Sequence, residues 1–389
     1  MKIPTLDTDL FAPAVMADPF DAYRELRDLG PICLLGETGL YAMGRHADVK
    51  ATLANWHDFS SAQGVALNDI CNGFMRGTPI ASDPPDHTKF REILGGPLQP
   101  KQLAQLRGRL AELADERVQE VVGVGRIDAM LELARHLPLR VISELVGLPD
   151  DGRSRMLKWA DAGFNSMGPA HDPRTEQALG TMAEMVAYIC NPDLPARFRE
   201  GSWSAELWKS VTKGDLMADA ACQILQGYVT PSLDTTIFAL GTLLHLLATN
   251  PNEWRKLKEN SKLVPKCVNE ALRFDGPGRG FSRVVRREVQ VGDAILPVGA
   301  RVVTVLPAAN RDERRYENPD KFDILRDATD HVGFGGGIHR CVGGNLAMLE
   351  LTVMLDAIVK HVSEIEVFEY KLAENTVLRG FESLSVCLH

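Results

Sequence analysis

The stretch Phe334–Gly344, FGGGIHRCVGG, places five glycines around a single cysteine, Cys341. Glycine has no Cβ, so backbone N–H groups in such a loop can approach the sulfur closely. The residues that follow, 342–361, have the apolar periodicity of a helix, which places the sulfur beside a helix N-terminus. Both features stabilise a thiolate and suit it to bind a metal. By spacing alone, the loop is compatible with a thiolate ligand and with a cysteine that is incidental to a glycine turn.

The composition of the chain excludes several classes of protein. Its 389 residues are 45% hydrophobic, which is enough to bury a large core. Because 43 Lys and Arg face 52 Asp and Glu, the net charge is −9, whereas a protein that follows nucleic-acid phosphates is expected to be basic. Residues 1–28 show neither a signal-peptide core nor an Arg-rich transit pattern. We therefore expect a cytoplasmic protein that binds no nucleic acid and has no membrane anchor.

The cysteines do not suggest a disulfide framework or a zinc site. They are odd in number, widely scattered and without a C-x-x-C pair. Apart from Cys341, we expect them to be ordinary buried thiols; they are Cys33, Cys71, Cys190, Cys222, Cys267 and Cys387.

Most of the chain predicts helices that are separated by Pro and Gly. Helical runs cover residues 102–121 and 130–146, a hairpin is expected at 29–45 with Gly36 and Gly39 beside its turn, and two or three strands at 289–306. No internal repeat and no low-complexity linker interrupts the chain. We expect one mainly α domain, residues 1–389, with small β-sheets.

The longest helical pattern covers residues 215–249 and would span about 50 Å. It is apolar on nearly all sides, which favours a buried core helix over a membrane span, because Pro231 and Asp234 interrupt the apolar run. Pro231 cannot donate to the carbonyl of Gly227, so the hydrogen-bond ladder should open there. Asp234 and Thr235 beside this opening fit either a packing kink or a catalytic pair.

The cysteine loop as a whole resembles the haem-binding loop of the cytochrome P450 monooxygenases. The matching positions are Phe334, Gly335, Gly337, His339, Cys341 and Gly343. The resemblance extends upstream to Glu270-x-x-Arg273 and to residues 308–326, which resemble the family's meander. It implies a helix-rich triangular prism with small β-sheets near the N- and C-terminal parts.

The resemblance also implies a cofactor and its contacts. Haem b would be held by Cys341 as the axial thiolate ligand of the iron, within a loop that includes Phe334 and Gly343. Charge-assisted bonds would hold the haem propionates. The residues at the family's propionate-binding positions are His87, Arg91, Arg283 and His339. Glu270 and Arg273, three residues apart on one helix face, would form a partly buried structural pair.

For catalysis, the resemblance assigns Asp234 and Thr235 to the family's acid–alcohol pair, which delivers protons while one oxygen atom of O2 is inserted into the substrate. One departure is visible, because relatives usually carry Ala-Gly or Gly-Gly where this chain has Pro231-Ser232.

The electrons must come from outside the chain. The sequence has no G-x-G-x-x-G nucleotide unit and no ferredoxin-like cysteine run. An external iron–sulfur ferredoxin and an NAD(P)H-dependent ferredoxin reductase are therefore implied. A basic face for the ferredoxin is expected at Lys89, Lys101, Arg107, Arg109 and Arg340.

The segments FSSAQGVALND, FNSMGP, SLDTT and LRGFESL resemble the subgroup that oxidises para-substituted benzoates. The resemblance predicts hydroxylation or O-demethylation of a small aromatic substrate. The candidate substrate contacts are Arg76 and Thr78, for a carboxylate, and Ser232 and Phe281. The alternatives are a haem-binding sensor or recruitment protein without turnover, and a peroxide-driven or nitric-oxide-reducing relative. The retained acid–alcohol pair favours the monooxygenase.

Overall fold

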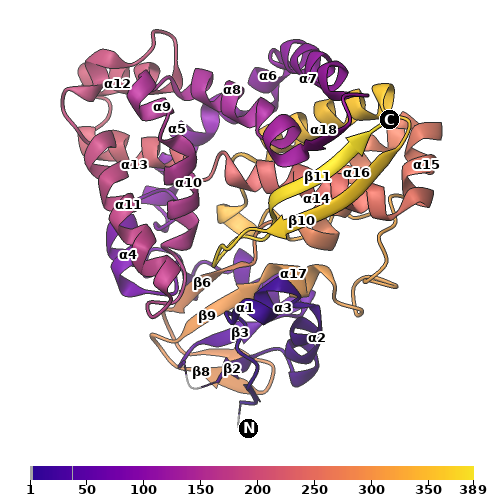
Figure 1. The fold of residues 1–389 in the computed structure, drawn as a ribbon. Coiled ribbons are helices and arrows are strands. Elements are labelled where there is room, and N and C mark those ends of the chain that lie inside the picture. Colours follow the sequence, from indigo (N-terminus) through magenta and orange to yellow (C-terminus); the bar gives the residue numbers. More distant parts are fainter. Residues whose placement is uncertain (1–2, 37) are drawn as a thin grey trace.

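The computed structural model describes residues 3–36 and 38–389. A six-stranded sheet and the N-terminal helices form one end of the molecule, and the remaining helices form the rest (Figure 1). The sheet has the order β1-β2-β3-β9-β6-β4. Its strands are β1 (Thr5–Leu6), β2 (Cys33–Leu35), β3 (Tyr41–Met43), β9 (Arg301–Val305), β6 (Gly280–Val285) and β4 (Phe59–Ser60).

The predicted strands are present. β2 and β3 form the expected antiparallel hairpin, with Gly36 and Gly39 at positive φ; residue 37 of its turn lies outside the described residues. The segment 289–306 contributes β9 and the two-stranded ladder of β7 (Val289–Val291) and β8 (Ala294–Leu296). A three-stranded sheet has the order β10-β11-β5. Its strands are β10 (Ile365–Leu372), β11 (Phe381–Leu388) and β5 (Arg126–Asp128).

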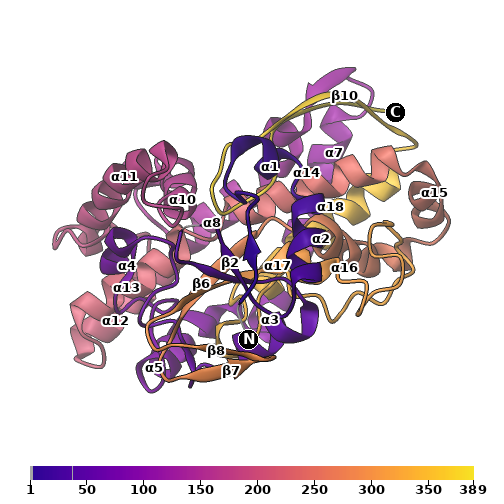
Figure 2. The same ribbon diagram turned by 90° about the horizontal axis from the view of Figure 1, so that it is seen from below.

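The helices of the first half are α1 (Pro13–Ala17), α2 (Phe20–Leu29), α3 (His46–Ala54), α4 (Asp69–Met75), α5 (Asp86–Gly95), η1 (Gly96–Leu98), α6 (Pro100–Ala104), α7 (Arg107–Val121), η2 (Met130–Ala134), α8 (His136–Val146), α9 (Asp150–Arg153), α10 (Met156–Asn165), α11 (Pro173–Ile189), η3 (Leu194–Arg197) and α12 (Trp203–Lys213). The expected run 102–121 is thus divided between α6 and α7, and 130–146 begins with a π-helical turn, η2, before α8. Among the helices of the first half, α4, α10, α11 and α12 lie together in the wing at the left of Figure 2, whereas α7 lies on the opposite side of the molecule.

The helices of the second half contain the centre of the core, where α14 and α18 pack against each other and against α16. They are α13 (Ala218–Val229), α14 (Asp234–Thr249), α15 (Pro251–Glu259), η4 (Ser261–Leu263), α16 (Val264–Asp275), α17 (Leu306–Asn310), η5 (Gly337–His339) and α18 (Gly344–His361). α7 packs along the outer side of α18.

The prediction of one helix over 215–249 was wrong in two respects. The helix begins at Ala218, and residues 230–233 separate it into α13 and α14, so the proline break is wider than a local opening. Hydroxyl groups cover the carbonyls at the break: Ser232 Oγ donates to Val229 O at 3.3 Å, and Thr235 Oγ1 donates to Pro231 O at 3.0 Å. Among the described residues, Ala218–Thr249 alone is long and apolar enough to cross a membrane, but 72% of its most apolar window is buried inside the protein, as in a core helix.

Candidate functional site

The cysteine loop leads directly into α18. Within the loop, Gly335 N donates to Val332 O at 2.8 Å and Cys341 N donates to Phe334 O at 2.8 Å. Gly337 has a φ of +63°, and a Cβ at this position would lie 2.2 Å from the carbonyl oxygen of Leu53 on α3. Glycine is therefore required there both by backbone conformation and by the close approach of α3.

The groups around Cys341 have opposite effects on the pKa of its thiol. The protein atoms that surround the residue raise the pKa of its thiol, although the side chain remains accessible. The backbone N–H groups of Gly343 and Gly344 lower this pKa, as do the positive charges of Arg91 and Arg340. Gly343 is the N-cap of α18, so the helix N-terminus faces the sulfur as the sequence predicts. The amides and cations are the groups that favour a thiolate over a thiol.

Basic side chains from three elements converge beside this loop. The His87 ring on α5 lies 4.3 Å from the His339 ring, centroid to centroid. Arg91, also on α5, donates to the carbonyl of Arg340. Arg283 on β6 is buried, and its Nη1 donates to Ser282 O at 2.7 Å.

These groups mutually disfavour their charged forms. Burial lowers the pKa of Arg283 to about 10. Burial, and then the charges of Arg283, His87 and Arg91, lower the pKa of His339 to about 2. The carboxylate of Asp83 opposes this effect for Arg283 and His87. His339 Nε2 has no hydrogen-bond partner among the described residues. A buried cluster of this kind fits an anionic group that carries two charges.

The acid at the helix break is buried without a hydrogen-bond partner. Asp234 is 7% exposed, and its Oδ2 has no partner in the described part of the chain. Burial, followed by the nearby carboxylate of Asp161, raises the pKa of Asp234 to about 7, and Arg135 acts in the opposite direction. Asp234 can therefore hold or release a proton near neutral pH, next to the hydroxyl of Thr235.

The Glu270–Arg273 pair is more deeply buried than the sequence suggested, because both side chains are fully buried rather than partly buried. Two parallel bonds of 2.7 and 2.8 Å join them. Arg273 Nη1 also donates to the carbonyls of Asn310 and Pro319, at 2.9 Å each. The pair therefore fastens α16 to the meander that precedes the cysteine loop.

Similarity to known proteins covers nearly the whole chain. The sequence pattern of the family described as Cytochrome P450 matches residues 223–366. The protein named Cytochrome p450 CYP199A2, from Rhodopseudomonas palustris, is 34% identical over 99% of this chain and 95% of its own length. This chain belongs to the cytochrome P450 family.

Solved structures of P450 enzymes have the same fold. P450BioI in complex with an acyl carrier protein that carries hexadec-9Z-enoic acid superposes with a TM-score of 0.88 at 21% identity, over 97% of this chain and 99% of that one. Cytochrome P450 CREJ in complex with (4-ethylphenyl) dihydrogen phosphate gives 0.84 at 26% identity, over 96% and 98% of the two chains. The predicted fold class is confirmed.

The residues of this P450 fit the family's cofactor. P450 enzymes hold haem b through a cysteine thiolate, and in this chain that residue is Cys341, at the N-terminus of α18. The unpartnered Nε2 of His339 and the cations beside it match the chemistry of two propionates. When bound, the haem iron activates O2, so this P450 is a monooxygenase that depends on O2 and on redox partners for electrons.

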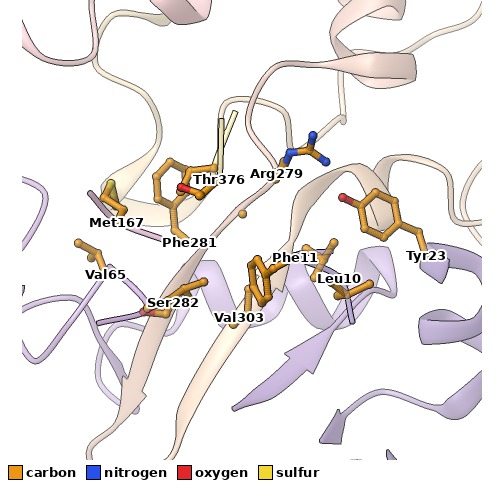
Figure 3. Close-up of a pocket in the computed structure, with 14 residues that line it drawn as sticks. Leu10, Phe11, Tyr23, Val65, Met167, Arg279, Phe281, Ser282, Val303 and Thr376 are labelled. Carbon is orange, nitrogen blue, oxygen red and sulfur yellow. The ribbon is translucent and has the colours of Figure 1, made fainter. Parts of the chain in front are cut away.

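The predicted substrate residues are not brought to one place in this P450. Arg76 lines a cavity of about 420 Å³ together with Gln63, Asp86 and Arg286. Phe281 lines a separate pocket of about 40 Å³, with Phe11 and Arg279 among its walls (Figure 3).

The two hydroxyl candidates are engaged locally. Thr78 is buried and its Oγ1 donates to Met75 O at 2.7 Å. Ser232 lies at the break between α13 and α14, two residues before Asp234, and its Oγ donates to Val229 O at 3.3 Å.

Two further carboxyl groups, the exposed one of Asp161 and the buried one of Glu350, were not singled out from the sequence. Asp161 on α10 faces Asp234 on α14 although 73 residues separate them (234 − 161), and no local pattern signals the contact. Glu350 is 3% exposed on α18, has no partner for Oε1 among the described residues, and its burial raises its pKa to about 8. A single glutamate within the apolar run LAMLELTVML was a visible signal for Glu350.

Proposed function

We propose that this P450 oxidises a small aromatic compound, a para-substituted benzoate or phenol, by hydroxylation or O-demethylation. Its electrons come from a ferredoxin and an NAD(P)H-dependent ferredoxin reductase, and residues 1–389 act as a single domain in the cytoplasm. The observation that carries the oxygen-inserting role is the buried, unpaired carboxyl of Asp234 beside the hydroxyl of Thr235, at the break between α13 and α14.

In this proposal, Asp234 and Thr235 move protons. A carboxyl group whose pKa is about 7 can take up a proton and give it back during turnover at neutral pH. Thr235 Oγ1 donates to Pro231 O in the structure and, by rotation of its side chain, can donate to another acceptor instead. Asp161, which faces Asp234 from α10 and accepts from Asn165 Nδ2 at 3.0 Å, continues this polar route outward.

The basic side chains beside the cysteine loop bind the cofactor in this proposal. His87, Arg91, Arg283 and His339 bind the two propionates, and the Phe334 ring and the Gly343 backbone border the thiolate. Glu270 and Arg273 hold the meander that supports the loop.

An anionic aromatic substrate is supported by two observations. Arg76 on the cavity wall is exposed, and no acidic partner for it is found among the described residues. The related P450 CREJ binds (4-ethylphenyl) dihydrogen phosphate, a para-substituted aromatic ring with an anionic end. We assign the carboxylate to Arg76, with Thr78 shaping the turn behind it, and the ring to the region of Ser232; Phe281 lines the separate pocket and is left out of this assignment.

Lys89, Lys101 and Arg340 are the cations that best suit a ferredoxin, because the described residues give them no ion-pair partner. Arg107 already forms an ion pair with Asp356 at 3.8 Å, and Arg109 forms one with Glu144 at 2.5 Å.

Two assays test the proposal. Spectral titration of the ferric holoenzyme with para-substituted benzoates should shift its Soret band to shorter wavelength, and Arg76→Ala should weaken binding about tenfold or more, as expected for a charge-assisted bond. Lys89→Ala, a cation outside the cavity, is the matched control. If no benzoate or phenol produces a shift, the substrate class is wrong.

Turnover with ferredoxin, its reductase, NAD(P)H and O2 should then be compared with turnover driven by hydrogen peroxide alone. The monooxygenase requires the complete electron-transfer system for efficient product formation. Product from peroxide alone would identify a peroxide-driven relative, and binding without product in either assay would identify a sensor.

A further inference from the structure

Two cysteines remote in sequence lie against each other, away from the haem-binding loop. Cys190 directly follows α11 and is exposed, and Cys222 on α13 is 7% exposed. Cys222 Sγ lies 3.9 Å from the carbonyl oxygen of Ile189, the residue before Cys190, so the side chain of Cys222 adjoins the backbone that carries Cys190. The expectation that every cysteine except Cys341 is an ordinary buried thiol was therefore wrong for Cys190, which is exposed, and for Cys387, which is only half-buried.

The contact gives the two thiols different chemical characters. The hydrogen bond from Cys222 lowers the pKa of the Cys190 thiol, and the same bond together with burial raises the pKa of Cys222. Asp219, on the same helix as Cys222, raises both. The exposed sulfur of Cys190 is thus the better nucleophile, and Cys222 keeps its proton beside it.

The other cysteines lack this arrangement. Cys33, Cys71 and Cys267 are buried, and burial raises the pKa of each thiol. Cys341 binds the haem iron. Cys387 is half-buried and, among the described residues, is a free cysteine.

We propose that Cys190 and Cys222 are an oxidative modification site, at which hydrogen peroxide converts the two thiols into an intramolecular disulfide. The Cys190 thiolate attacks one peroxide oxygen; an S–O bond forms, the O–O bond breaks, and the departing hydroxide takes up a proton to become water. Cys222 then attacks the sulfenic sulfur; the S–S bond forms, the S–O bond breaks, and the second water leaves with the thiol proton. The two thiols lose two electrons and two protons, and one peroxide becomes two waters.

The disulfide would tie the end of α11 to α13 and close a loop that contains η3 and α12. α13 leads directly into the break at Ser232, so the modification restrains the helices that border the proposed active site. A dithiol reductant restores the free thiols, which makes the modification reversible.

Peptide mapping of the holoenzyme tests the proposal. The two cysteines fall in separate tryptic peptides, residues 175–197 and 214–255, each with one cysteine. After treatment with hydrogen peroxide and alkylation under denaturing conditions, unreduced digests should contain these two peptides joined, and the joined species should disappear on reduction. The reduced carbon-monoxide spectrum, recorded in parallel, verifies that the Cys341 ligand is intact.

Variants separate the two steps. In Cys222→Ser, Cys190 should stop at the sulfenic acid, which dimedone traps. In Cys190→Ser, a change at an exposed position, Cys222 should remain fully alkylatable after peroxide, and Cys387→Ser should behave as the unaltered protein. The proposal is overturned if peroxide leaves Cys190 alkylatable, joins it to a second chain, or oxidises it without engaging Cys222.

Discussion

Two buried polar regions of this P450 flank the cysteine loop and differ in how their groups are paired. Around Glu270 and Arg273, the charged atoms meet partners within the chain: the bidentate pair itself, the carbonyls of the meander and a further bond from Arg326 at 3.2 Å. In contrast, Asp234 Oδ2 at the helix break and His339 Nε2 in the cysteine loop have no partner in the described residues. A paired network stabilises the fold, whereas unpaired groups cost stability and are available to a cofactor or a proton.

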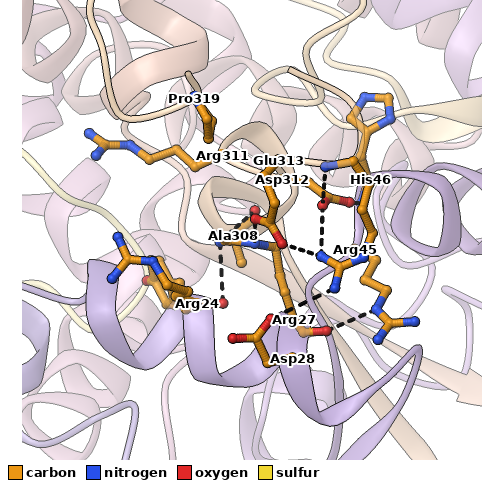
Figure 4. A network of polar contacts seen from close by, with 12 residues as sticks. Arg24, Arg27, Asp28, Arg45, His46, Ala308, Arg311, Asp312, Glu313 and Pro319 are labelled. Carbon is orange, nitrogen blue, oxygen red and sulfur yellow. Dashed lines mark hydrogen bonds and ion pairs between the residues drawn. The ribbon is translucent and has the colours of Figure 1, made fainter. Parts of the chain in front are cut away.

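The paired region continues along the meander toward the N-terminal helices (Figure 4). Arg27 on α2 donates to Glu313 at 3.1 Å and to Ala308 O at 3.2 Å. The backbone N–H of His46, at the start of α3, donates to Asp312 at 2.8 Å. Because α3 is also the helix that Gly337 approaches, this network fixes the surface on which the cysteine loop rests.

The largest expected effect is on the unpaired side. Cys341→Ser replaces the thiolate by a hydroxyl, a far weaker donor to iron, so turnover should fall to the background rate. The reduced carbon-monoxide complex should also lose the red-shifted absorption of sulfur ligation. Cys387→Ser is the control for removal of a thiol elsewhere. A variant that retained the red-shifted band would show that another residue is the ligand.

On the paired side, Arg273→Ala should lower the free energy of unfolding by about 3–5 kcal/mol, because it leaves the Glu270 carboxylate buried without its partner. Chemical denaturation of the holoenzyme measures this loss. Arg24→Ala removes two exposed ion pairs, with Asp21 and with Asp320, and should cost no more than about 1 kcal/mol. Equal losses in the two variants would contradict the structural role of the buried pair.

Asp234→Asn should have opposite effects on turnover and on stability. Turnover should fall roughly 100-fold, because an amide does not relay protons. Stability at pH 8 should rise, since the substitution removes a buried carboxylate that lacks a hydrogen-bond partner for Oδ2. Steady-state turnover and chemical denaturation give the two readouts. A variant that lost stability and kept its turnover would place Asp234 with the structural network.

The pH dependence of the free energy of unfolding gives a second test of the unpaired carboxyl of Asp234. The carboxyl of Asp234 has a pKa of about 7 in the folded protein and near 3.9 when unfolded, so between these values the folded state binds more protons. This group's contribution is therefore fully present below the unfolded pKa and is lost as pH rises toward 7. Between pH 5 and 6.5 the loss should be about 2 kcal/mol.

Denaturation of the unaltered holoenzyme and of Asp234→Asn at several pH values isolates this contribution. The variant should show a shallower pH slope, because the side chains of Asp161 and Arg135, which face the group, are the same in both proteins and only the carboxyl of Asp234 is removed. Parallel slopes for the two proteins would mean that Asp234 does not hold its proton in the folded state.

The features that the sequence predicted are those that depend on neighbours along the chain. The glycine loop, the helix after Cys341 and the i,i+3 pair of Glu270 and Arg273 are local patterns, and the structure contains each of them. The break at Pro231 follows from its missing N–H, although its width was not predictable from that alone.

The features that were missed depend on tertiary approach. Asp161 reaches Asp234, and Cys190 reaches Cys222, only because helices distant in sequence pack together. For the same reason, the sequence could not show that Arg76 and Phe281 line different cavities. Burial of Glu270 and Arg273 was underestimated because the meander covers them from the far side.

The smallest expected effect is that of a substitution at Thr235. Its hydroxyl is hydrogen-bonded to Pro231 O, as in the paired region, but it lies next to the unpaired carboxyl of Asp234. Thr235→Val keeps the shape of the side chain, so the free energy of unfolding should change by no more than about 1 kcal/mol, whereas turnover should fall about tenfold through loss of one hydrogen bond. Thr236→Val, a buried neighbour at 6% exposure, is the matched control, and Thr235→Ser should restore turnover. If Thr235→Val lowered stability while turnover stayed intact, the hydroxyl would serve only to cover the proline break, and proton delivery would rest on Asp234 alone.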